Sequence, residues 1–403
     1  MRRTNLLAAL AFVIGTALCS GAAVQSGDAE ARFNKIWQTT RDNMYDKDMN
    51  GVDWKSIGDR YRTQAAEAKT KTAFKTVINR MLAELHTSHT AYFDDDDLEL
   101  YLLKSLFEND MENNQIEHIG VTGNYVDGAF VVKAILNGGP ADLAGIKVDD
   151  KIVDVDGKKF STVGAFQGKS GTSVKITIER PGASRQVLPV APIRQNPQQA
   201  FLEASRKSAR VIEVGGRRIG YFHLWTMTND KFKDALDAAL TGKLATTDGL
   251  ILDMRDGFGG HPFKFTDVLF RPDIDWKQTQ RGRPVTYRTG YGKPIVVLIN
   301  EGTRSAKESF AFQIKKTGRG PLVGATTAGA FLGAGGFPIS SDSYLELPVV
   351  DLALDGVRLE GVGVSPDITV TAQDTYGPND RQLAKGLEVI TEKLNGAKGI
   401  KVP

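Results

Sequence analysis

The sequence predicts a multidomain α/β protein with a helical N-terminal segment, a β-rich middle module and a C-terminal core of alternating strands and helices. Three observations support this. Apolar residues recur at helical spacing between residues 28 and 103, short strands with Gly-rich turns follow from residue 116, and apolar strands alternate with helices from 211 to 395. With 403 residues and 41% hydrophobic content, the chain has enough apolar sequence for more than one core.

The first 23 residues are typical of a secretory signal peptide. Arg2 and Arg3 precede an apolar run over residues 6–18, and small residues follow at 20–23. The run is shorter than the ~20 apolar residues that a membrane span needs, although an uncleaved anchor stays open as an alternative. We therefore expect residues 1–23 to be removed. The mature protein is then expected to be periplasmic or secreted from a bacterium, without stable membrane insertion.

Composition excludes several classes of protein. Cys19 is the only cysteine, so cleavage of the signal would leave no disulfide, thiol nucleophile or thiolate metal site. A lipoprotein at Cys19 stays open, although Leu18 stands where such signals usually have Gly or Ala. The net charge is +3 with no basic stripe, so nucleic acid is not an expected partner. No motif with metal-ligand spacing is present, and no metal or organic cofactor is expected.

Three domains are expected after the signal: a helical domain over 24–105, a β-rich domain over 106–195 and a larger core over 196–403. The helical domain contains the stretch Ser88-His89-Thr90. The acidic run Asp94–Asp97 follows it and is expected to be an exposed loop, with a calcium site as the less favoured alternative.

The middle module has a specific order of short motifs. Ile119-Gly120-Val121 comes first, Gly139-Pro140-Ala141 starts a short helix, and the strand Asp149–Asp156 ends in a turn at Gly157. This combination resembles a PDZ domain over roughly residues 110–195. PDZ domains add an extended peptide C-terminus to a sheet edge, with loop N–H groups around its carboxylate. The resemblance implies that Ile119, Gly120 and Val121 form that loop; a spacer without a ligand is the alternative.

Two stretches of the core could perform acyl transfer. Ser305 follows a buried strand and begins a helix, where N–H groups and the helix dipole stabilise an anion, although a plain capping role is the alternative. The stretch Asp253–Gly260 contains three glycines, at 257, 259 and 260, that let backbone N–H groups approach a ligand. Such donors could form an oxyanion hole, and an ordinary Gly-rich turn is the alternative.

A serine nucleophile needs a base and a group that orients it. The sequence offers five histidines, which are His86, His89, His118, His223 and His261. Glu360 lies in a Gly-rich turn and is a candidate orienting carboxylate.

These stretches, in this order around a PDZ-like segment, resemble the C-terminal processing and tricorn-like serine peptidase family. The resemblance implies a crotonase-like or ClpP-like ββα core. One branch of the family uses a lysine as base, and Ala330 occupies that position here. The other branch uses Ser, His, Ser and Glu. Matching it residue by residue implies Ser305 as nucleophile, His89 as base, Ser88 and Glu360 as its support, and the amides of Ala306 and of Gly259 or Gly260 as the oxyanion hole.

The expected function is an exported serine endopeptidase that cleaves proteins or peptides through an acyl-enzyme. The PDZ-like module would recognise substrate C-termini or gate the site. A catalytically inactive binding protein or scaffold on the same fold is the alternative. With an unperturbed pKa of ~6.5, His89 predicts an acidic limb of activity near pH 6 to 7. Lys307 is expected to point away from Ser305, so its replacement should cost little activity.

Overall fold

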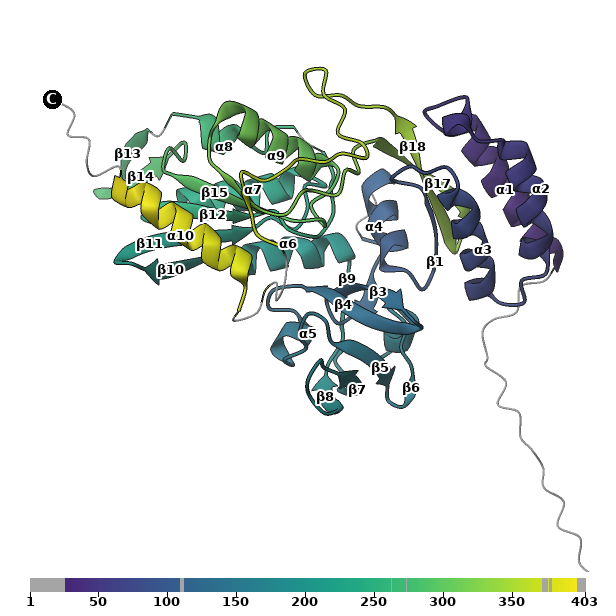
Figure 1. Ribbon diagram of the computed structural model, residues 1–403. Coiled ribbons are helices and arrows are strands. Elements are labelled where there is room, and N and C mark those ends of the chain that lie inside the picture. The colour runs from purple at the N-terminus through teal and green to yellow at the C-terminus, as the bar shows by residue number, and fades with distance from the viewer. Residues whose placement is uncertain are drawn as a thin grey trace, which may run out of the picture.

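The computed structural model describes residues 26–108, 112–261, 263–272, 274–371, 376 and 379–396. The predicted signal peptide, residues 1–23, lies outside them. Figure 1 shows helix α4 between the N-terminal helices and the α/β unit, with the β-rich module below. In the part of the chain that is described, no helix has the length and apolarity required of a membrane span.

The N-terminal unit is a helical layer packed on a small sheet. Its helices begin at capped positions: the Asp53 side chain accepts from the Ser56 amide, and that of Thr70 accepts from the Ala73 amide. Strand β1 then pairs with β18, antiparallel, in the order β1-β18-β17, so a hairpin from the C-terminal half completes this unit. The elements are α1 (Ser26–Asn43), η1 (Met49–Gly51), α2 (Trp54–Ala66), α3 (Lys71–Ala83), β1 (Ala91–Asp94), α4 (Leu98–Phe107), β17 (Gly333–Ser340) and β18 (Ser343–Val350).

The acidic run at residues 94–97 is only partly exposed, so the expectation of an exposed loop holds for Asp95 and is wrong for the rest of the run. Asp94 is buried at the end of β1, and Lys75 donates to both Asp94 and Asp97, at 2.9 and 2.8 Å. Asp96 accepts hydrogen bonds from the β-rich module. A run of carboxylates in the sequence does not show that a lysine 19 to 22 residues earlier will bind it.

The middle module is a six-stranded antiparallel sheet with its own apolar core, which includes Phe130, Ile152 and Ile176. Pro140 stands at the first turn of the short helix α5, where its missing N–H costs nothing. The elements are β2 (Ile116–His118), β3 (Val121–Val126), β4 (Ala129–Ile135), α5 (Pro140–Leu143), β5 (Lys151–Val155), β6 (Lys158–Lys159), η2 (Gly164–Phe166), β7 (Val174–Glu179), β8 (Gln186–Val190) and β9 (Ile193–Gln195).

The C-terminal unit is a six-stranded sheet in the order β10-β11-β12-β15-β16-β19, parallel except for the β10–β11 pair. Every residue of β12 and β15 is buried, as expected for parallel strands covered on both faces. The strands are β10 (Arg210–Val214), β11 (Arg217–His223), β12 (Gly249–Asp253), β15 (Ile295–Ile299), β16 (Leu322–Gly324) and β19 (Ile368–Thr369), with the hairpin β13 (Asp275–Gln280) and β14 (Arg283–Arg288).

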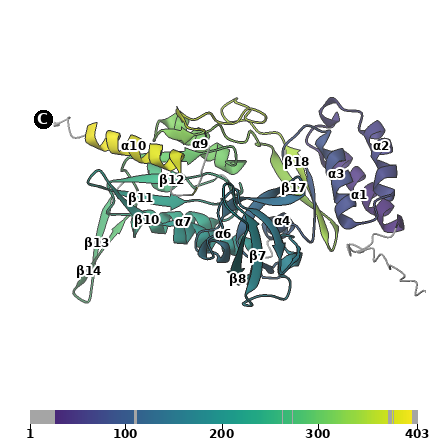
Figure 2. The ribbon, with the colours of Figure 1, turned by 60° about the horizontal axis from the view of Figure 1, so that its bottom comes forward.

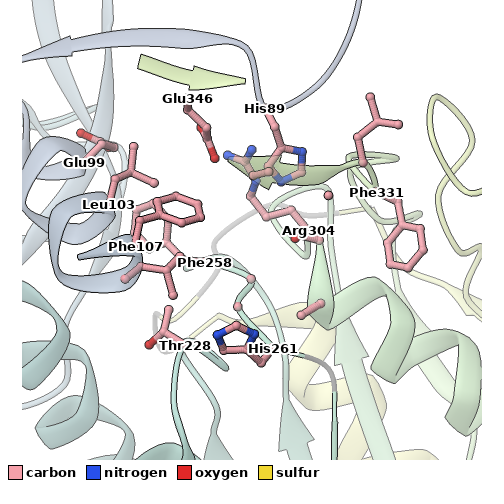
Figure 3. Close-up of a pocket in the computed structure, with 18 of the residues that line it drawn as sticks. His89, Glu99, Leu103, Phe107, Thr228, Phe258, His261, Arg304, Phe331 and Glu346 are labelled. Atoms are coloured by element: carbon pink, nitrogen blue, oxygen red, sulfur yellow. The ribbon is translucent and has the colours of Figure 1, made fainter. Parts of the chain in front are cut away.

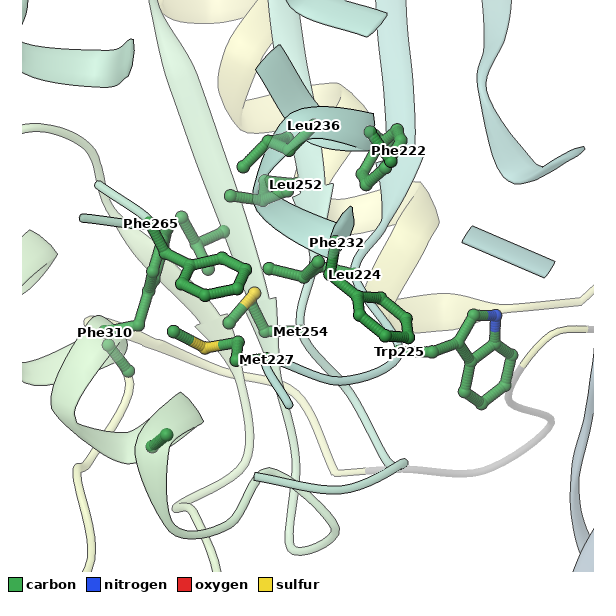
Figure 4. Packing of buried hydrophobic residues seen from close by; sticks show 14 of the residues in the cluster. Phe222, Leu224, Trp225, Met227, Phe232, Leu236, Leu252, Met254, Phe265 and Phe310 are labelled. Carbon is green, nitrogen blue, oxygen red and sulfur yellow. The ribbon is translucent and has the colours of Figure 1, made fainter. Parts of the chain in front are cut away.

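Helices cover both faces of this sheet (Figure 2). Helix α10 packs on one face, through Ile390 against Ile251, while α6 and α7 lie on the other. Figure 4 shows Phe232 and Phe310 packed with Met227 and Met254 in the larger core. The predicted multidomain α/β class is confirmed. The helices are α6 (Pro197–Ser208), α7 (Asp230–Thr241), α8 (Asp267–Phe270), α9 (Ala306–Thr317) and α10 (Arg381–Gly396).

Candidate active site

Ser305 lies between strand β15 and helix α9 in a conformation that is rare for a residue with a side chain. Its φ is +56° and its ψ is −127°. Such a conformation costs about 1–3 kcal/mol and persists only where the surroundings enforce it. The Ser305 amide donates to Ala330 O at 2.9 Å and to a carboxylate oxygen of Glu308 at 3.1 Å. The chain is therefore held in a sharp turn at the predicted nucleophile.

Glu308 connects this turn to the loop at residues 327–330. Its buried carboxylate accepts from Thr327 Oγ1 at 2.6 Å, from the Gly329 amide at 2.8 Å and from the Ala330 amide at 2.9 Å. Burial raises the pKa of Glu308, and these hydrogen bonds act against that shift. Sequence reasoning assigned no role to Glu308, although the Ser305-x-x-Glu308 spacing of a capping box was a signal for it.

The Gly-rich loop approaches Ser305 more closely than any side chain would allow. A Cβ on Gly259 would lie 2.4 Å from Ser305 Cβ and 2.7 Å from its Oγ. Gly259 O accepts from the Met227 amide at 2.8 Å and from Thr226 Oγ1 at 2.9 Å. The C=O and N–H of one trans peptide unit point in opposite directions, so the Gly260 N–H faces away from that segment.

The predicted oxyanion residues share one cavity with Ser305. Gly259, Gly260 and Ala306 all line it. Ala306 is the first residue of α9, so its amide has no acceptor within the helix. The structure therefore brings two suitable N–H donors, those of Gly260 and Ala306, to the walls around Ser305.

Ser88, His89 and Glu360 form a hydrogen-bonded chain although 272 residues separate Ser88 from Glu360. Glu360 accepts from the Ser88 amide and from Ser88 Oγ, each at 2.9 Å, and from the Phe331 amide at 2.7 Å. Ser88 Oγ lies 2.8 Å from His89 Nδ1. Because the single hydroxyl proton of Ser88 goes to the carboxylate, Nδ1 must be the donor in that bond. His89 Nε2 is then unprotonated, as a general base requires.

The surroundings of His89 favour the neutral imidazole. Burial is the main cause that lowers the pKa of His89 to about 3, and the positive charge of Arg304 is the second. His89 therefore stays unprotonated well below pH 6. This revises the acidic limb near pH 6 to 7, which assumed an unperturbed pKa for His89.

The other four histidines differ from His89 in position or in partners. His261 also lines the cavity, but its side chain is exposed and no hydrogen-bonded chain orients it among the described residues. His86 is exposed. His118 and His223 are buried, and His223 Nε2 lies 2.9 Å from Arg255 O.

The cavity has a volume of about 290 Å³, and both His89 and Ser305 line it. Figure 3 shows His89 and Arg304 on its wall. In the described residues, no hydrogen bond joins these two side chains; catalytic bonds often tighten only when substrate binds. Sequence reasoning also missed three charged lining residues, Glu99, Arg304 and Glu346. Burial raises the pKa of both glutamates. The apolar wall comes from α4 through Leu103, Leu106 and Phe107.

The predicted peptide-binding loop of the middle module faces inward. Ile119 and Val121 are buried, and Gly120 lies with them in a small recess. That recess is closed by Leu98 of α4 and Phe201 of α6. Capture of a peptide carboxylate by this loop stays a prediction, and it would require the module to move away from α4 and α6.

Three family models match the chain. The model described as Peptidase family S41 covers residues 218–370, the Tricorn protease C1 domain covers 28–83, and a PDZ domain covers 131–180. The chain therefore contains a peptidase family S41 domain, over residues 218–370. The expected enzyme class, a serine-type peptidase, is confirmed at the level of the family, and the middle module is a PDZ domain.

Curated relatives and solved structures agree with this family. The carboxyl-terminal-processing protease of Synechocystis sp. is 24% identical over 97% of this chain and 94% of the relative. Tricorn protease homolog 1 of Streptomyces coelicolor is 25% identical over 90% of the chain, which spans only 35% of that relative's length. The solved photosystem II D1 C-terminal processing protease shares the fold, with a TM-score of 0.51 and 22% identity over 89% of this chain and 95% of that one.

Proposed function

We propose that this protein is an exported serine endopeptidase that cleaves proteins or peptides through an acyl-enzyme at Ser305. The observation that supports this most strongly is the hydrogen-bonded chain from Glu360 through Ser88 to His89, whose imidazole opens onto the same cavity as Ser305. A helix cap or a scaffold has no need of an oriented, unprotonated histidine beside a strained serine.

The proposed reaction has two steps. His89 Nε2 takes the proton of Ser305 Oγ as Oγ attacks the scissile carbonyl carbon, and the oxyanion accepts from the Gly260 and Ala306 amides. The imidazolium then gives its proton to the leaving amine, which departs and leaves an ester on Ser305. Water, deprotonated by His89, hydrolyses that ester and restores the serine.

The test is covalent labelling combined with turnover. Wild-type protein should hydrolyse an unstructured protein substrate and react with an active-site serine phosphonate. Ser305→Ala should do neither while keeping its circular dichroism spectrum. Turnover by Ser305→Ala near the wild-type rate would refute the assignment, and a folded wild-type protein without turnover or labelling would favour a binding protein.

We also propose that the PDZ domain gates the site. The PDZ domain contacts the turn at Asp96, between β1 and α4. Strand β1 follows His89, and α4 lines the cavity. The Gly164 and Val163 amides donate to Asp96 Oδ1 at 2.7 and 3.3 Å, and Thr162 Oγ1 donates to Asp96 O. A shift of the PDZ domain would therefore displace both His89, which precedes β1, and helix α4, and these line the cavity.

Asp96→Ala should change kcat/KM by about 2- to 5-fold, since hydrogen bonds to a charged group contribute on the order of 1 kcal/mol or more. Asp234→Ala, at an exposed carboxylate on α7, is the control. Calorimetry should also show tighter binding of a peptide than of its C-terminal amide once Asp96 is removed. Unchanged kinetics in Asp96→Ala would argue against gating through this contact.

Export is part of the proposal and rests on the first 23 residues. The motif of two arginines, an apolar run and small residues favours a periplasmic or secreted location. Mass spectrometry of the mature N-terminus after expression in a bacterial host tests it: cleavage near residue 23 is expected, and an intact N-terminus in the membrane fraction would contradict it.

A further inference from the structure

Lys307 lies beneath the Gly-rich loop and not toward solvent. It is fully buried on the first turn of α9, two residues after Ser305. Its Nζ donates to Asp256 O at 2.6 Å and to Trp225 O at 3.3 Å, with Arg255 O at 3.5 Å. Among the described residues its hydrogen-bond acceptors are thus backbone carbonyls, and Ser305 Oγ is not one of them.

A buried ammonium held only by carbonyls is costly for the folded state. Burial lowers the pKa of Lys307 to about 7, while the carboxylates of Asp253 and Asp256 act in the opposite direction. An apolar side chain of similar length would fill this space without the desolvation penalty of a charge. The position therefore has a hydrogen-bond donor where packing alone does not require one.

The loop above Lys307 has an unusual backbone that explains why a donor is needed. Asp256 has a φ of +48°, Gly257 of +75° and Gly260 of +133°. A Cβ on Gly257 would lie 2.0 Å from Trp225 O, so the loop crosses directly over that carbonyl. The oxygens of Trp225 and Asp256 consequently converge on one side of the loop, and their partial negative charges repel unless a donor lies between them.

The other side of the same loop faces the cavity. The Phe258 amide donates to Trp225 O at 3.1 Å, and Gly259 O is held by the Met227 amide at 2.8 Å. With these carbonyls turned inward, the N–H of Gly260 points outward, on the side where Gly260 lines the cavity with Ser305. The direction of the oxyanion donor thus depends on the carbonyls below it staying in place.

We propose that Lys307 is a positioning residue, which holds the converging carbonyls of Trp225 and Asp256 so that the Gly260 amide faces the substrate oxyanion. This role rests on the proposed peptidase function. It replaces the expectation that the side chain is irrelevant, which came from its direction along the helix alone. Lys307 does not act as the base, since its ammonium is engaged below the loop.

The test compares Lys307→Met and Lys307→Arg with Lys316→Met, an exposed lysine on the same helix. In Lys307→Met, kcat should fall about 10- to 100-fold with KM within about 3-fold, because only transition-state stabilisation is lost. The inhibition constant of a peptide boronic acid, a tetrahedral oxyanion mimic, should rise by the same factor. Substrate peptide binding in a Ser305→Ala background should not change. Lys307→Arg should recover at least part of kcat, and Lys316→Met should match wild type.

Three outcomes would overturn the inference. The first is a Lys307→Met enzyme with wild-type kcat. The second is equal loss of boronate binding and substrate binding, which indicates general disruption. The third is a wild-type protein without turnover or phosphonate labelling. That result refutes the proposed function itself, whereas the first two refute only the role of Lys307. If Lys307→Met does not fold, Lys307→Gln is measured, and the same criteria apply.

Discussion

The two sides of the candidate site are built in different ways. The nucleophile side comes from one sheet and its loops, and buried groups such as Glu308 and Lys307 fix its backbone. The base side joins the loop of Ser88 and His89 to a turn at Glu360, through two hydrogen bonds of 2.9 Å from Ser88. The fold itself therefore sets the nucleophile, while the base depends on a contact between two units that could separate.

This difference has a physical consequence for control of activity. Moving the N-terminal unit or the PDZ domain by a small amount would leave Ser305 and its oxyanion donors in place. It would displace His89, because β1 and the turn at Asp96 connect that histidine to the PDZ domain. We expect changes on the nucleophile side to act on the chemical step directly, and changes on the base side to act on orientation.

Among variants that keep both Ser305 and His89, the largest effect is expected from Gly259→Ala, on the nucleophile side. Its Cβ would lie 2.4 Å from Ser305 Cβ, so the loop and the serine cannot keep their present positions. We predict a loss of about 1,000-fold in kcat/KM. The measurement is hydrolysis of an unstructured substrate, with Gly396→Ala at an open position as the control. Activity within 10-fold of wild type would show that the loop does not form the oxyanion hole.

A smaller loss is expected from Glu360→Gln, on the base side. The amide oxygen can still accept from the Ser88 hydroxyl and the Phe331 amide, but the NH2 group replaces the oxygen that accepts from the Ser88 amide, and the negative charge is lost. The tautomer of His89 is then less firmly set, and kcat should fall about 100-fold, less than for removal of the histidine. Glu301→Gln, an exposed glutamate before the nucleophile, is the control. A loss as large as that of His89→Ala would mean that Glu360 has a direct chemical role.

The smallest effect concerns pH. The base works unprotonated, and burial together with Arg304 lowers the pKa of His89 to about 3. Activity should therefore persist as pH falls to 5, where an imidazole of ordinary pKa would be only about 3% neutral. Arg304→Met removes a nearby positive charge, so the pKa of His89 should rise and the acidic limb should move up by about one pH unit. Profiles of kcat/KM with circular dichroism at each pH test this, and a wild-type limb at pH 6.5 would contradict it.

Much of the nucleophile side could be predicted because its signals are local. The continuous apolar run at residues 295–299 predicts a buried strand, and Ser305 follows it at a helix start. Glycines at 257, 259 and 260 predict close backbone approach, which the structure bears out in the contact between Gly259 and Ser305.

The remainder depends on contacts that local patterns do not specify. The strand β17 contains three glycines, so its sequence shows no alternation of apolar and polar residues, and it joins the sheet of β1 only through β18. Lys75 forms an ion pair within the acidic run that we expected to be exposed. Lys307 points beneath the Gly-rich loop and donates to Asp256 O. The pairing of Ser88 with Glu360 was implied by family resemblance, since nothing in the spacing of the two residues indicates it.

The central claim is that His89 and Ser305 act as one unit across the two sides of the site. The most direct test is the double-mutant cycle of His89→Ala and Ser305→Ala, measured as kcat/KM on one unstructured substrate. Each single variant should lose about 10⁴- to 10⁶-fold, and the double variant should be no more than about 3-fold worse than either. Substantial turnover by His89→Ala, or losses that multiply in the double variant, would contradict the account.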